Sequence, residues 1–230
     1  MQITALASSS KGNCYLISDG VSSILIEIGI PLKEIKSKVD INFTSLSGCL
    51  ISHEHNDHSK YAKDLIKYCD IYASSGTLEA INIETYKYKQ HTLKHGKVVE
   101  ISSFKVLPFD TQHDAKEPLG FLIQSNITGK KLLFATDTYY IKPRFSGLNY
   151  IMIECNYASD IADGNNLNKV VRERLKKSHF ELENVKSFLK ANNLSKVKKI
   201  YLIHLSDGNS DAERFKREIM ELTGIPVEVC

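Results

Sequence analysis

Short runs of apolar residues, separated by turn residues, make up most of the first half of the chain. The runs ITALA, CYLIS, SILIEIG, GCLIS and IYAS are rich in β-branched, aromatic and other apolar side chains, as expected of strands. We therefore predict strands at about 3–7, 14–18, 23–29, 48–52 and 71–74.

Two helices are predicted between these strands. The first covers about 33–39 and follows Pro31, a residue that is favoured where a helix begins. The second covers about 59–68, where apolar residues recur at the spacing of one helix face.

The second half of the chain has the same order of elements. The strand-like runs KVVEIS, SFKVLPFD, LGFLIQSN, KKLLFATD and NYIMIEC come first, and the stretch 164–192 is then mostly helical. KKIYLIH returns to strand, and a last helix covers about 211–222. Because strands precede helices in each half, we predict an α+β fold with two packed sheets flanked by helices, forming one domain over residues 1–230.

Composition and charge narrow the class of protein without identifying a substrate. Apolar residues make up 42% of the chain and charged residues 25%, and no apolar run reaches the roughly 20 residues of a membrane span. With no secretory signal at its start, we expect a cytoplasmic protein. Five scattered cysteines without a CxxC pair argue against disulfides and thiolate zinc sites, and the net charge of +3 permits a polyanionic substrate without requiring one.

The segment ISHEHNDHS concentrates potential metal ligands where an apolar strand should turn into a helix. On an extended segment His53 and His55 point to the same side, so both imidazoles can reach one ion. Asp57 and His58, on the following turn, can reach a second ion beside it. Imidazole and carboxylate suit zinc, iron or manganese. The alternative is a solvated, histidine-rich turn, which explains this concentration of ligands less well.

Three further candidate ligands each follow a strand-like apolar run. His113 follows FKVLPFDTQ, Asp137 follows KLLFAT and His204 follows KIYLI. Residues just beyond strand ends can converge on one rim of a pair of sheets. A single His or Asp at such a place is more often a cap or turn residue. Together with the first motif, the three predict a site for a pair of metal ions.

The motif HEHNDH and the three later residues resemble the metallo-β-lactamase superfamily. This resemblance covers essentially the whole chain and implies a four-layer αββα sandwich. It also implies two divalent transition-metal ions, zinc or manganese. The ligands implied are His53, His55 and His113 for one ion, Asp57, His58 and His204 for the other, and Asp137 as the bridge.

Separated motifs narrow the resemblance to the YycJ/WalJ-like subgroup, whose members are regarded as nucleases, including DNA exonucleases. These motifs are SSSKGNCYLI, SHEHNDH, QHDAKEPLGFLI, FATDT, IECNY, SHFELENV and HLSDGN. The chain departs from the subgroup at two places. Glu27 stands where members usually have Asp, which could alter the support of the metal site. SHFE at 178–181 stands where they usually have GHLS, which could alter substrate handling.

Candidates for substrate contacts lie outside the ligand set. His179 follows the basic stretch RERLKKS and precedes a predicted helix, where an imidazole could contact phosphate or protonate a leaving group. The alternatives are a water-exposed His179 and a basic stretch that is only a solvated helix face. By the resemblance, Ser10 and Asn13 in the polar loop 8–13 could bind a phosphate, although a plain hairpin turn fits equally well.

These features predict a metal-dependent phosphodiesterase, with a DNA nuclease preferred and 5′-to-3′ exonuclease action among the modes left open. A hydroxide bridging two ions would attack phosphorus, Asp57 would orient it, and His179 would protonate the leaving group. One alternative is a small-molecule hydrolase acting on a thioester, lactone or cyclic nucleotide. The other is a non-catalytic nucleic-acid binding module, which is weaker because structural zinc sites close with four ligands.

Overall fold

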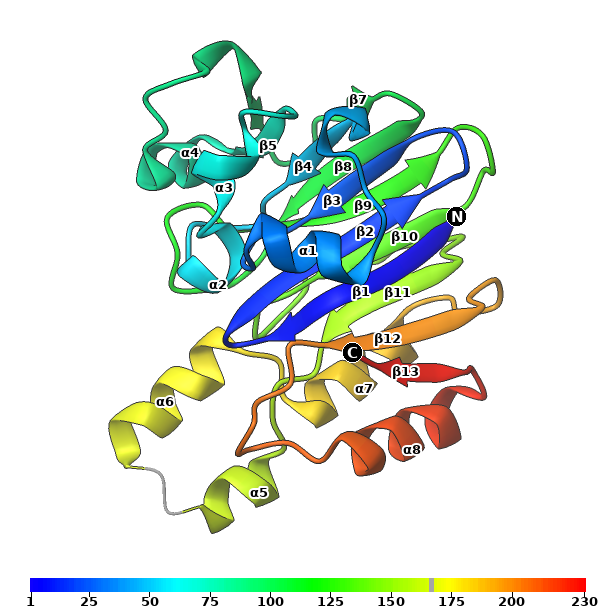
Figure 1. The fold of residues 1–230 in the computed structure, drawn as a ribbon. Helices are drawn as coiled ribbons and strands as arrows, with labels where there is room; N and C mark the ends of the chain where they lie inside the picture. The colour runs from blue at the N-terminus through cyan, green and yellow to red at the C-terminus, as the bar shows by residue number, and fades with distance from the viewer. Residues whose placement is uncertain (166–167) are drawn as a thin grey trace.

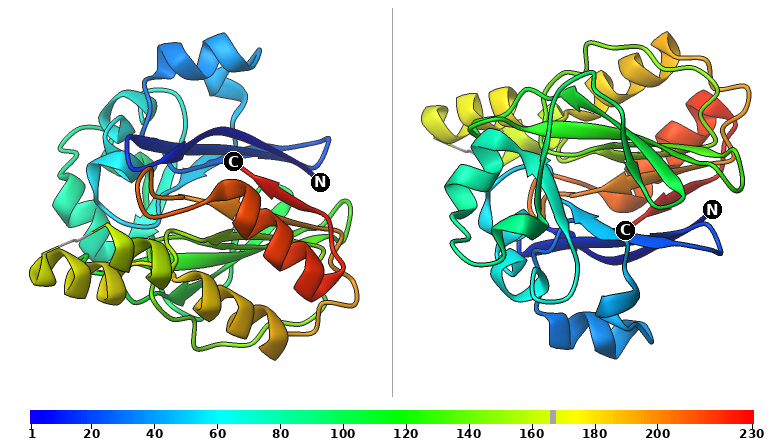
Figure 2. Two further views of the ribbon diagram at one scale, coloured as in Figure 1. Left: turned by 90° about the horizontal axis from the view of Figure 1, so that it is seen from below. Right: turned by 90° about the horizontal axis from the view of Figure 1, so that it is seen from above.

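Two β-sheets packed face to face form the centre of the molecule (Figure 1). This computed structural model describes residues 1–165 and 168–230. The first sheet has the strand order β1-β2-β3-β4-β5-β6, and the second has the order β13-β12-β11-β10-β9-β8-β7. Figure 2 shows the sheets edge-on, with helices on their outer sides. The predicted αββα sandwich is therefore confirmed.

The first sheet is formed by residues up to 93, and its strands run antiparallel from β1 to β3 and parallel from β3 to β6. Its strands are β1 (Gln2–Ser9), β2 (Gly12–Ser18), β3 (Ser23–Ile26), β4 (Gly48–Leu50), β5 (Ile71–Ser74) and β6 (Gln90–Leu93). The helices of this half are α1 (Leu32–Lys38), α2 (Asn56–Ser59), α3 (Ala62–Leu65) and α4 (Ser75–Ile81), with 3-10 turns η1 (Phe43–Ser45) and η2 (Lys87–Lys89).

The second sheet is antiparallel from β7 to β10 and parallel from β10 to β13. Its strands are β7 (Val99–Ile101), β8 (Phe104–Asp110), β9 (Leu119–Ser125), β10 (Lys131–Ala135), β11 (Tyr150–Glu154), β12 (Lys199–Ile203) and β13 (Val227–Val229). The helices of this half are α5 (Ser159–Gly164), α6 (Lys169–Ser178), α7 (Leu182–Ala191) and α8 (Ala212–Thr223). Most of the helical prediction for 164–192 is confirmed, while 166–167 lie outside the described residues.

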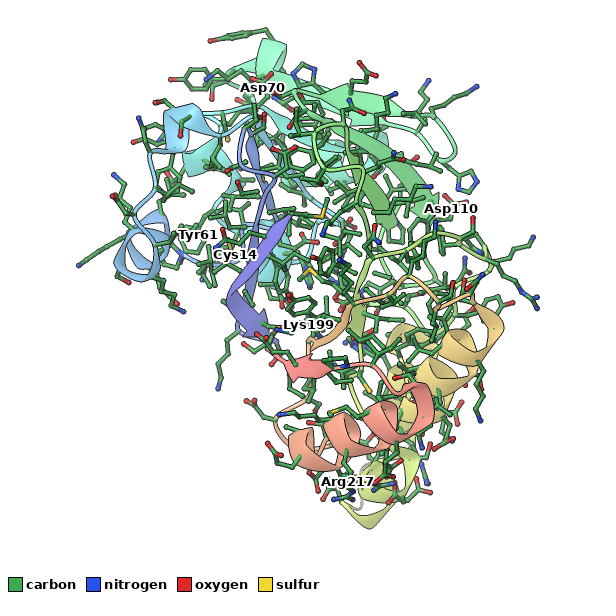
Figure 3. The ribbon with its side chains drawn as sticks, turned by 90° about the vertical axis from the view of Figure 1, so that its right-hand side faces the viewer. Cys14, Tyr61, Asp70, Asp110, Lys199 and Arg217 are labelled. Atoms are coloured by element: carbon green, nitrogen blue, oxygen red, sulfur yellow. The ribbon has the colours of Figure 1, made fainter. Side chains whose placement is uncertain are left out.

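Alternation along the strands divides the apolar side chains between separate layers of the core. Ile24, Ile26 and Phe134 are fully buried between the two sheets. Leu25 lies on the opposite face of β3, in the layer beneath the helices of the first half, and Leu133 lies likewise beneath the helices of the second half. Figure 3 shows side chains filling the space between the sheets, and α8, which carries Arg217, on the outside.

One buried carboxylate ties the β2–β3 turn to the second sheet. Asp19 accepts hydrogen bonds from the hydroxyls of Ser103 at 2.6 Å and Ser125 at 2.8 Å, and from the backbone N–H of Ser22 at 2.9 Å. Burial alone would raise the pKa of Asp19, but these hydrogen bonds outweigh it and lower the pKa to about 2. The turn is thereby fixed against the edge of the opposite sheet.

The secondary structure differs from the prediction at three places. The helix expected at 59–68 is limited to α3, and α2 begins earlier and ends at Ser59. The two are separated because the Tyr61 N–H between them donates to the carbonyl of Ile28 at 3.1 Å. Strand β6 and helix α4 were not predicted. The residues of β6 are mostly polar and half exposed, so they lack the alternation that marks a strand.

The composition predicted no membrane-spanning segment and no disulfide framework. Across residues 1–165 and 168–230, no helix has the length and apolar character needed to cross a membrane. The five cysteines are unpaired in this part of the chain, and all but Cys230 are buried.

Candidate metal centre

The predicted ligands all follow strand ends at one edge of the sandwich. The HEHNDH segment follows β4, and the other three residues follow β8, β10 and β12. Because β10, β11 and β12 are parallel neighbours, their carboxyl ends meet at the same edge of the second sheet. The structure therefore brings together side chains that are up to 151 positions apart, from His53 to His204.

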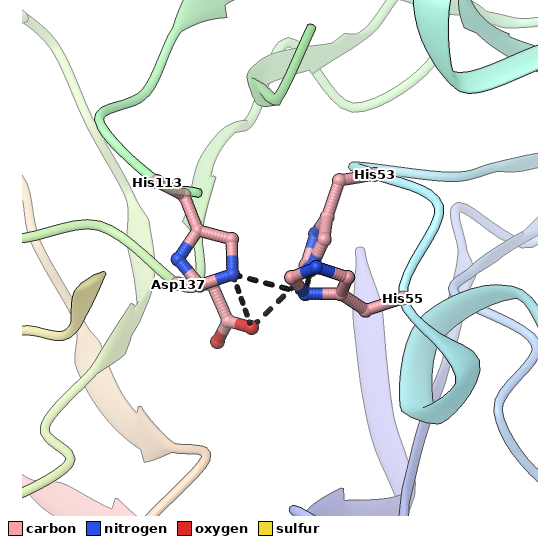
Figure 4. A group of neighbouring side chains, drawn as sticks. All are labelled: His53, His55, His113 and Asp137. Atoms are coloured by element: carbon pink, nitrogen blue, oxygen red, sulfur yellow. Dashed lines mark hydrogen bonds and ion pairs between the residues drawn. The ribbon is translucent and has the colours of Figure 1, made fainter. Parts of the chain in front are cut away.

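The first group of converging atoms comes from His53, His55, His113 and Asp137 (Figure 4). His55 Nδ1 lies 3.1 Å from both His53 Nε2 and His113 Nε2. Asp137 Oδ2 lies 3.3 Å from His53 Nε2 and 3.6 Å from His113 Nε2. Ligand bonds of about 2.0 Å in a tetrahedral site place the ligand atoms roughly 3.3 Å apart. The four atoms are therefore spaced as ligands of one ion.

The second group consists of Asp57, His58, His204 and again Asp137. Asp57 Oδ2 lies 3.1 Å from His58 Nε2 and 3.1 Å from His204 Nε2. His58 Nε2 is also 3.1 Å from Asp137 Oδ2, the oxygen that faces the first group. The residues thus fit two neighbouring ions that share one carboxylate.

Strong and opposed charge effects act inside this cluster. Burial alone would raise the pKa of Asp137, but His204 and His58 hold it well below its usual range. Burial would lower the pKa of His204, but Asp137 and Asp57 raise it to about 10. Burial and the neighbouring His58 lower the pKa of His53 to about 3. Asp137 is thus charge-paired with His58 and His204, whereas His53 is uncharged at neutral pH.

The ring nitrogens that face away from the cluster have partners of their own. His53 Nδ1 lies 2.9 Å from the Ser52 hydroxyl, and His113 Nδ1 donates to the carbonyl oxygen of Ser178 at 2.9 Å. Such contacts fix the ring orientation and leave Nε2 for an ion. The surrounding protein therefore holds these two histidines with Nε2 toward the cluster.

Glu27 lies directly behind His58. It is fully buried, its carboxylate accepts the backbone N–H of Ser52 at 3.3 Å, and it lies 3.7 Å from His58 Nδ1. That nitrogen has no hydrogen-bond partner among the described residues, so Glu27 acts on it as a nearby charge. Glu27, which stands where members of the subgroup usually have Asp, thus lies directly beside the predicted ligand His58.

Glu154, at the end of β11, is a site residue that the sequence analysis missed. Its carboxylate accepts the backbone N–H groups of Thr138 and Phe180, each at 3.0 Å, and it lies 2.7 Å from His179 Nδ1. It is also 3.4 Å from His204 Nδ1. The only signal in the sequence was a Glu that closes the apolar run NYIMIEC.

The predicted position of His179 at a helix start was wrong. His179 is the C-terminal cap of α6, and α7 begins at Leu182 with Glu181 as its N-terminal cap. The position therefore offers no helix N-terminus to an anion. The orientation of His179 comes instead from Glu154, which outweighs burial and raises the pKa of His179. Its side chain is 23% exposed and borders the cluster.

The two loop residues predicted to bind substrate have different surroundings. Asn13 is fully buried, and its amide Nδ2 donates to the carbonyl and the carboxylate of Asp57, each at 3.3 Å. Its contacts therefore support the ligand loop, the segment 53–58 that carries four of the candidate ligands. Ser10 is exposed in the turn between β1 and β2, on a plain hairpin.

Arginines of the basic stretch in α6 are partly engaged within the protein. Arg172 is paired with Asp163, and Arg174 with Asp114 at 3.0 Å. The alternative of a solvated helix face therefore fits these two arginines better than a path for nucleic acid.

Comparisons with known proteins agree with this geometry. Residues 32–205 match the model of a family described as Beta-lactamase superfamily domain. The chain is 26% identical to Exodeoxyribonuclease YycJ of Bacillus anthracis, over 96% of this chain and 89% of that protein. It is 27% identical to Exodeoxyribonuclease WalJ of Streptococcus pneumoniae, over 90% of this chain and 82% of that protein.

Among solved structures, the metallo-beta-lactamase fold protein YhfI from Bacillus subtilis has the same fold. The TM-score is 0.76 at 15% identity, and the match covers 99% of this chain and 95% of that chain. The resemblance to metallo-β-lactamase-fold proteins and the YycJ/WalJ-like subgroup, predicted from separated motifs, is confirmed.

Gly29 offers a test of how the fold holds the ligand loop. A Cβ atom at this position would lie 1.8 Å from the carbonyl oxygen of Asp57. That oxygen belongs to the backbone, so it cannot move aside as the end of a flexible side chain can. We expect Gly29→Ala to displace the loop, to lower the free energy of unfolding by about 3 kcal/mol and to weaken metal binding. Urea denaturation and elemental analysis measure the two effects.

Gly208→Ala is the matched control, because a Cβ there meets nothing within 4 Å. Its stability and metal content should match those of the unmodified protein. Equal stability and equal metal content in Gly29→Ala would contradict the role given to the close approach.

Proposed function

Since the chain belongs to the beta-lactamase superfamily, we propose that it is a phosphodiesterase that hydrolyses nucleic acid, DNA in particular, using two divalent ions. Zinc and manganese both suit the imidazole and carboxylate donors. The observation that carries this proposal is the position of Asp137 Oδ2, within 3.6 Å of ring nitrogens of both ligand groups. The names of the curated relatives support DNA as the substrate and exonuclease as the mode of action.

The side chains of the cluster would divide the work between holding ions and handling water. Ions bound there would lower the pKa of a water molecule and stabilise charge on the phosphate oxygens. Asp137, at 3% exposed, is enclosed between the two ligand groups. Asp57 is 22% exposed, so its carboxylate also borders the open side, where it can orient water toward the phosphate.

His179 is our candidate for protonating the leaving group. Its Nδ1 donates to Glu154 at 2.7 Å, which fixes the plane of the ring and leaves Nε2 for a substrate oxygen. A positioned imidazolium can transfer its proton as the ester bond breaks. Glu154 acts as a positioning residue here, because it would act on the substrate only through His179.

The first prediction of this proposal concerns metal content. The protein should bind about two divalent ions per chain after reconstitution, and Asp137→Ala should lower that number most, because this carboxylate faces both groups. Elemental analysis with parallel turnover measurements checks this. His95→Ala is the matched control, since its side chain is 59% exposed outside the cluster. Unchanged metal content in Asp137→Ala would refute the shared carboxylate.

The choice of substrate is tested by a turnover panel. It compares 5′-labelled and 3′-labelled single-stranded and duplex DNA, RNA, a cyclic nucleotide and a thioester, each with zinc or manganese. We expect DNA to be cut fastest and its binding to weaken linearly with the logarithm of salt concentration, because phosphate contacts release counterions. If DNA is neither bound nor cut at low salt while the thioester turns over, the nuclease proposal fails.

The roles of His179 and His204 can be separated by substitution. We expect His179→Ala to keep its metal content and to lose turnover by about 100-fold, the size of a typical acid-base contribution. His204→Ala should lose metal and activity together. Metal stoichiometry and single-turnover cleavage of DNA are measured on both variants. Loss of metal from His179→Ala alone would reverse the two roles, and full activity in that variant would remove His179 from the chemistry.

A further inference from the structure

A groove of about 400 Å³ lies beside the candidate metal centre, between the loop 139–144 and helix α7. Its apolar lining includes the buried side chains of Ile141, Phe180 and Phe188. One rim is the loop, and the other is a stripe of α7 that contains Asn184, Ser187 and Ala191. Residues at this spacing share one face of a helix. The groove thus has an apolar floor and polar walls.

The groove begins next to the residues that would do the chemistry. Tyr139 follows Asp137 by two positions, so their Cα atoms are at most about 7 Å apart. The backbone of the rim is also fixed to the loop of His113, because the Gln112 N–H donates to the Thr138 hydroxyl at 2.9 Å and the Tyr139 N–H donates to the Gln112 carbonyl at 3.3 Å. Its rim and the candidate ligands therefore form one connected backbone unit.

Aromatic and cationic side chains are exposed along the loop rim. Tyr139 is 38% exposed and Tyr140 is 55% exposed. Lys142 and Arg144 are exposed as well, and neither forms an ion pair with any residue of 1–165 or 168–230. Proteins that hold single-stranded nucleic acid combine such features, with bases stacked on aromatic rings and phosphates near cations.

We propose that this groove binds the single-stranded end of the nucleic acid that leads to the metal centre, an inference that rests on the proposed function. Bases pack on Tyr139 and Tyr140, and phosphates lie near Lys142 and Arg144. The stripe from Asn184 to Ala191 spans about 10 Å along α7, room for roughly three stacked nucleotides. A duplex does not fit a groove of this size, so the groove favours an unpaired strand.

The stacking contact is tested by stopped-flow binding of a fluorescent oligothymidylate to the manganese-loaded protein, read in the binding phase that precedes cleavage. We expect Tyr139→Ala combined with Tyr140→Ala to weaken binding at least 10-fold, since loss of stacking on one base alone typically costs about that much. Tyr140→Phe keeps the ring and should bind like the unmodified protein. Tyr88→Ala is the matched control, because Tyr88 is 76% exposed and lies outside the groove.

The pairing of phosphates with the two cations is tested through salt. Lys142→Gln combined with Arg144→Gln should reduce the slope of log affinity against log salt by about 1.4, because each phosphate that a cation neutralises on a single strand contributes about 0.7.

An oligonucleotide that carries 5-iodouracil should photocross-link to Tyr139 or Tyr140, as read by mass spectrometry of the peptides. Cross-links confined to other segments would overturn the proposal.

The outcomes separate this inference from the proposed function. If the unmodified protein binds and cuts DNA while the tyrosine pair variant binds the oligonucleotide equally well, the groove does not hold the strand and the nuclease proposal stands. If the unmodified protein binds no nucleic acid at all, the proposed function fails and the groove inference with it. Weakened binding in Tyr140→Phe equal to that of the alanine variant would also count against stacking.

Discussion

The buried carboxylate of Asp137 is the interaction on which the site depends. A buried charge is stable only when it is paired, and this one lies 3.4 Å from a ring nitrogen of His204 and 3.1 Å from one of His58, the two histidines that lower its pKa. These imidazoles follow strands of different sheets, so their contacts with one carboxylate join the two halves at this edge of the sandwich. Removing that carboxylate would leave Asp57, 3.1 Å from His58 and from His204, as the nearest remaining counter-charge for both imidazoles.

The backbone around the cluster carries strain. Glu27, Asp137 and His204 each follow a strand and have positive φ values of 63°, 43° and 54°. This region costs a non-glycine residue about 1 to 2 kcal/mol, and such strain persists only where the surroundings over-determine it. Here the left-handed turn lets the chain leave each strand directly toward the cluster. The contacts of these side chains offset the cost of the turn.

The ligand loop is fitted to the turn after β3 through the backbone. The Ile28 N–H donates to the His58 carbonyl at 2.7 Å, and Tyr61 donates back to Ile28. Gly29 allows the two segments to approach because it lacks a side chain. These bonds also explain why the expected helix at 59–68 is interrupted. The Tyr61 N–H bonds to the carbonyl of Ile28 and not to a carbonyl of the helix, so the helix is interrupted at this residue.

The parts that could be predicted from the sequence were local or densely marked. The order of strand-like runs and helices predicted two packed sheets flanked by helices, and the resemblance implied their αββα layering. HEHNDH and the ends of three apolar runs indicated the candidate ligands, because each signal lies within a few residues. Glu154 was missed because its partners come from the segments around Thr138 and His179, and only tertiary structure brings them together. His179 was misplaced because the cap of α7 is Glu181, a residue less common in that role than Ser, Thr, Asp or Asn.

A single loop after β10 links these features. Asp137 opens it inside the cluster, the Thr138 N–H donates to the carboxylate of Glu154, and Tyr139 begins the rim of the groove. A strand held by the groove is therefore held by the same backbone that positions Asp137 and, through Glu154, His179. Binding energy gained away from the scissile bond can then orient the phosphate between the ligands and the candidate acid. In such an arrangement, changes to the groove would affect the rate on long strands more than the chemistry of the cluster itself.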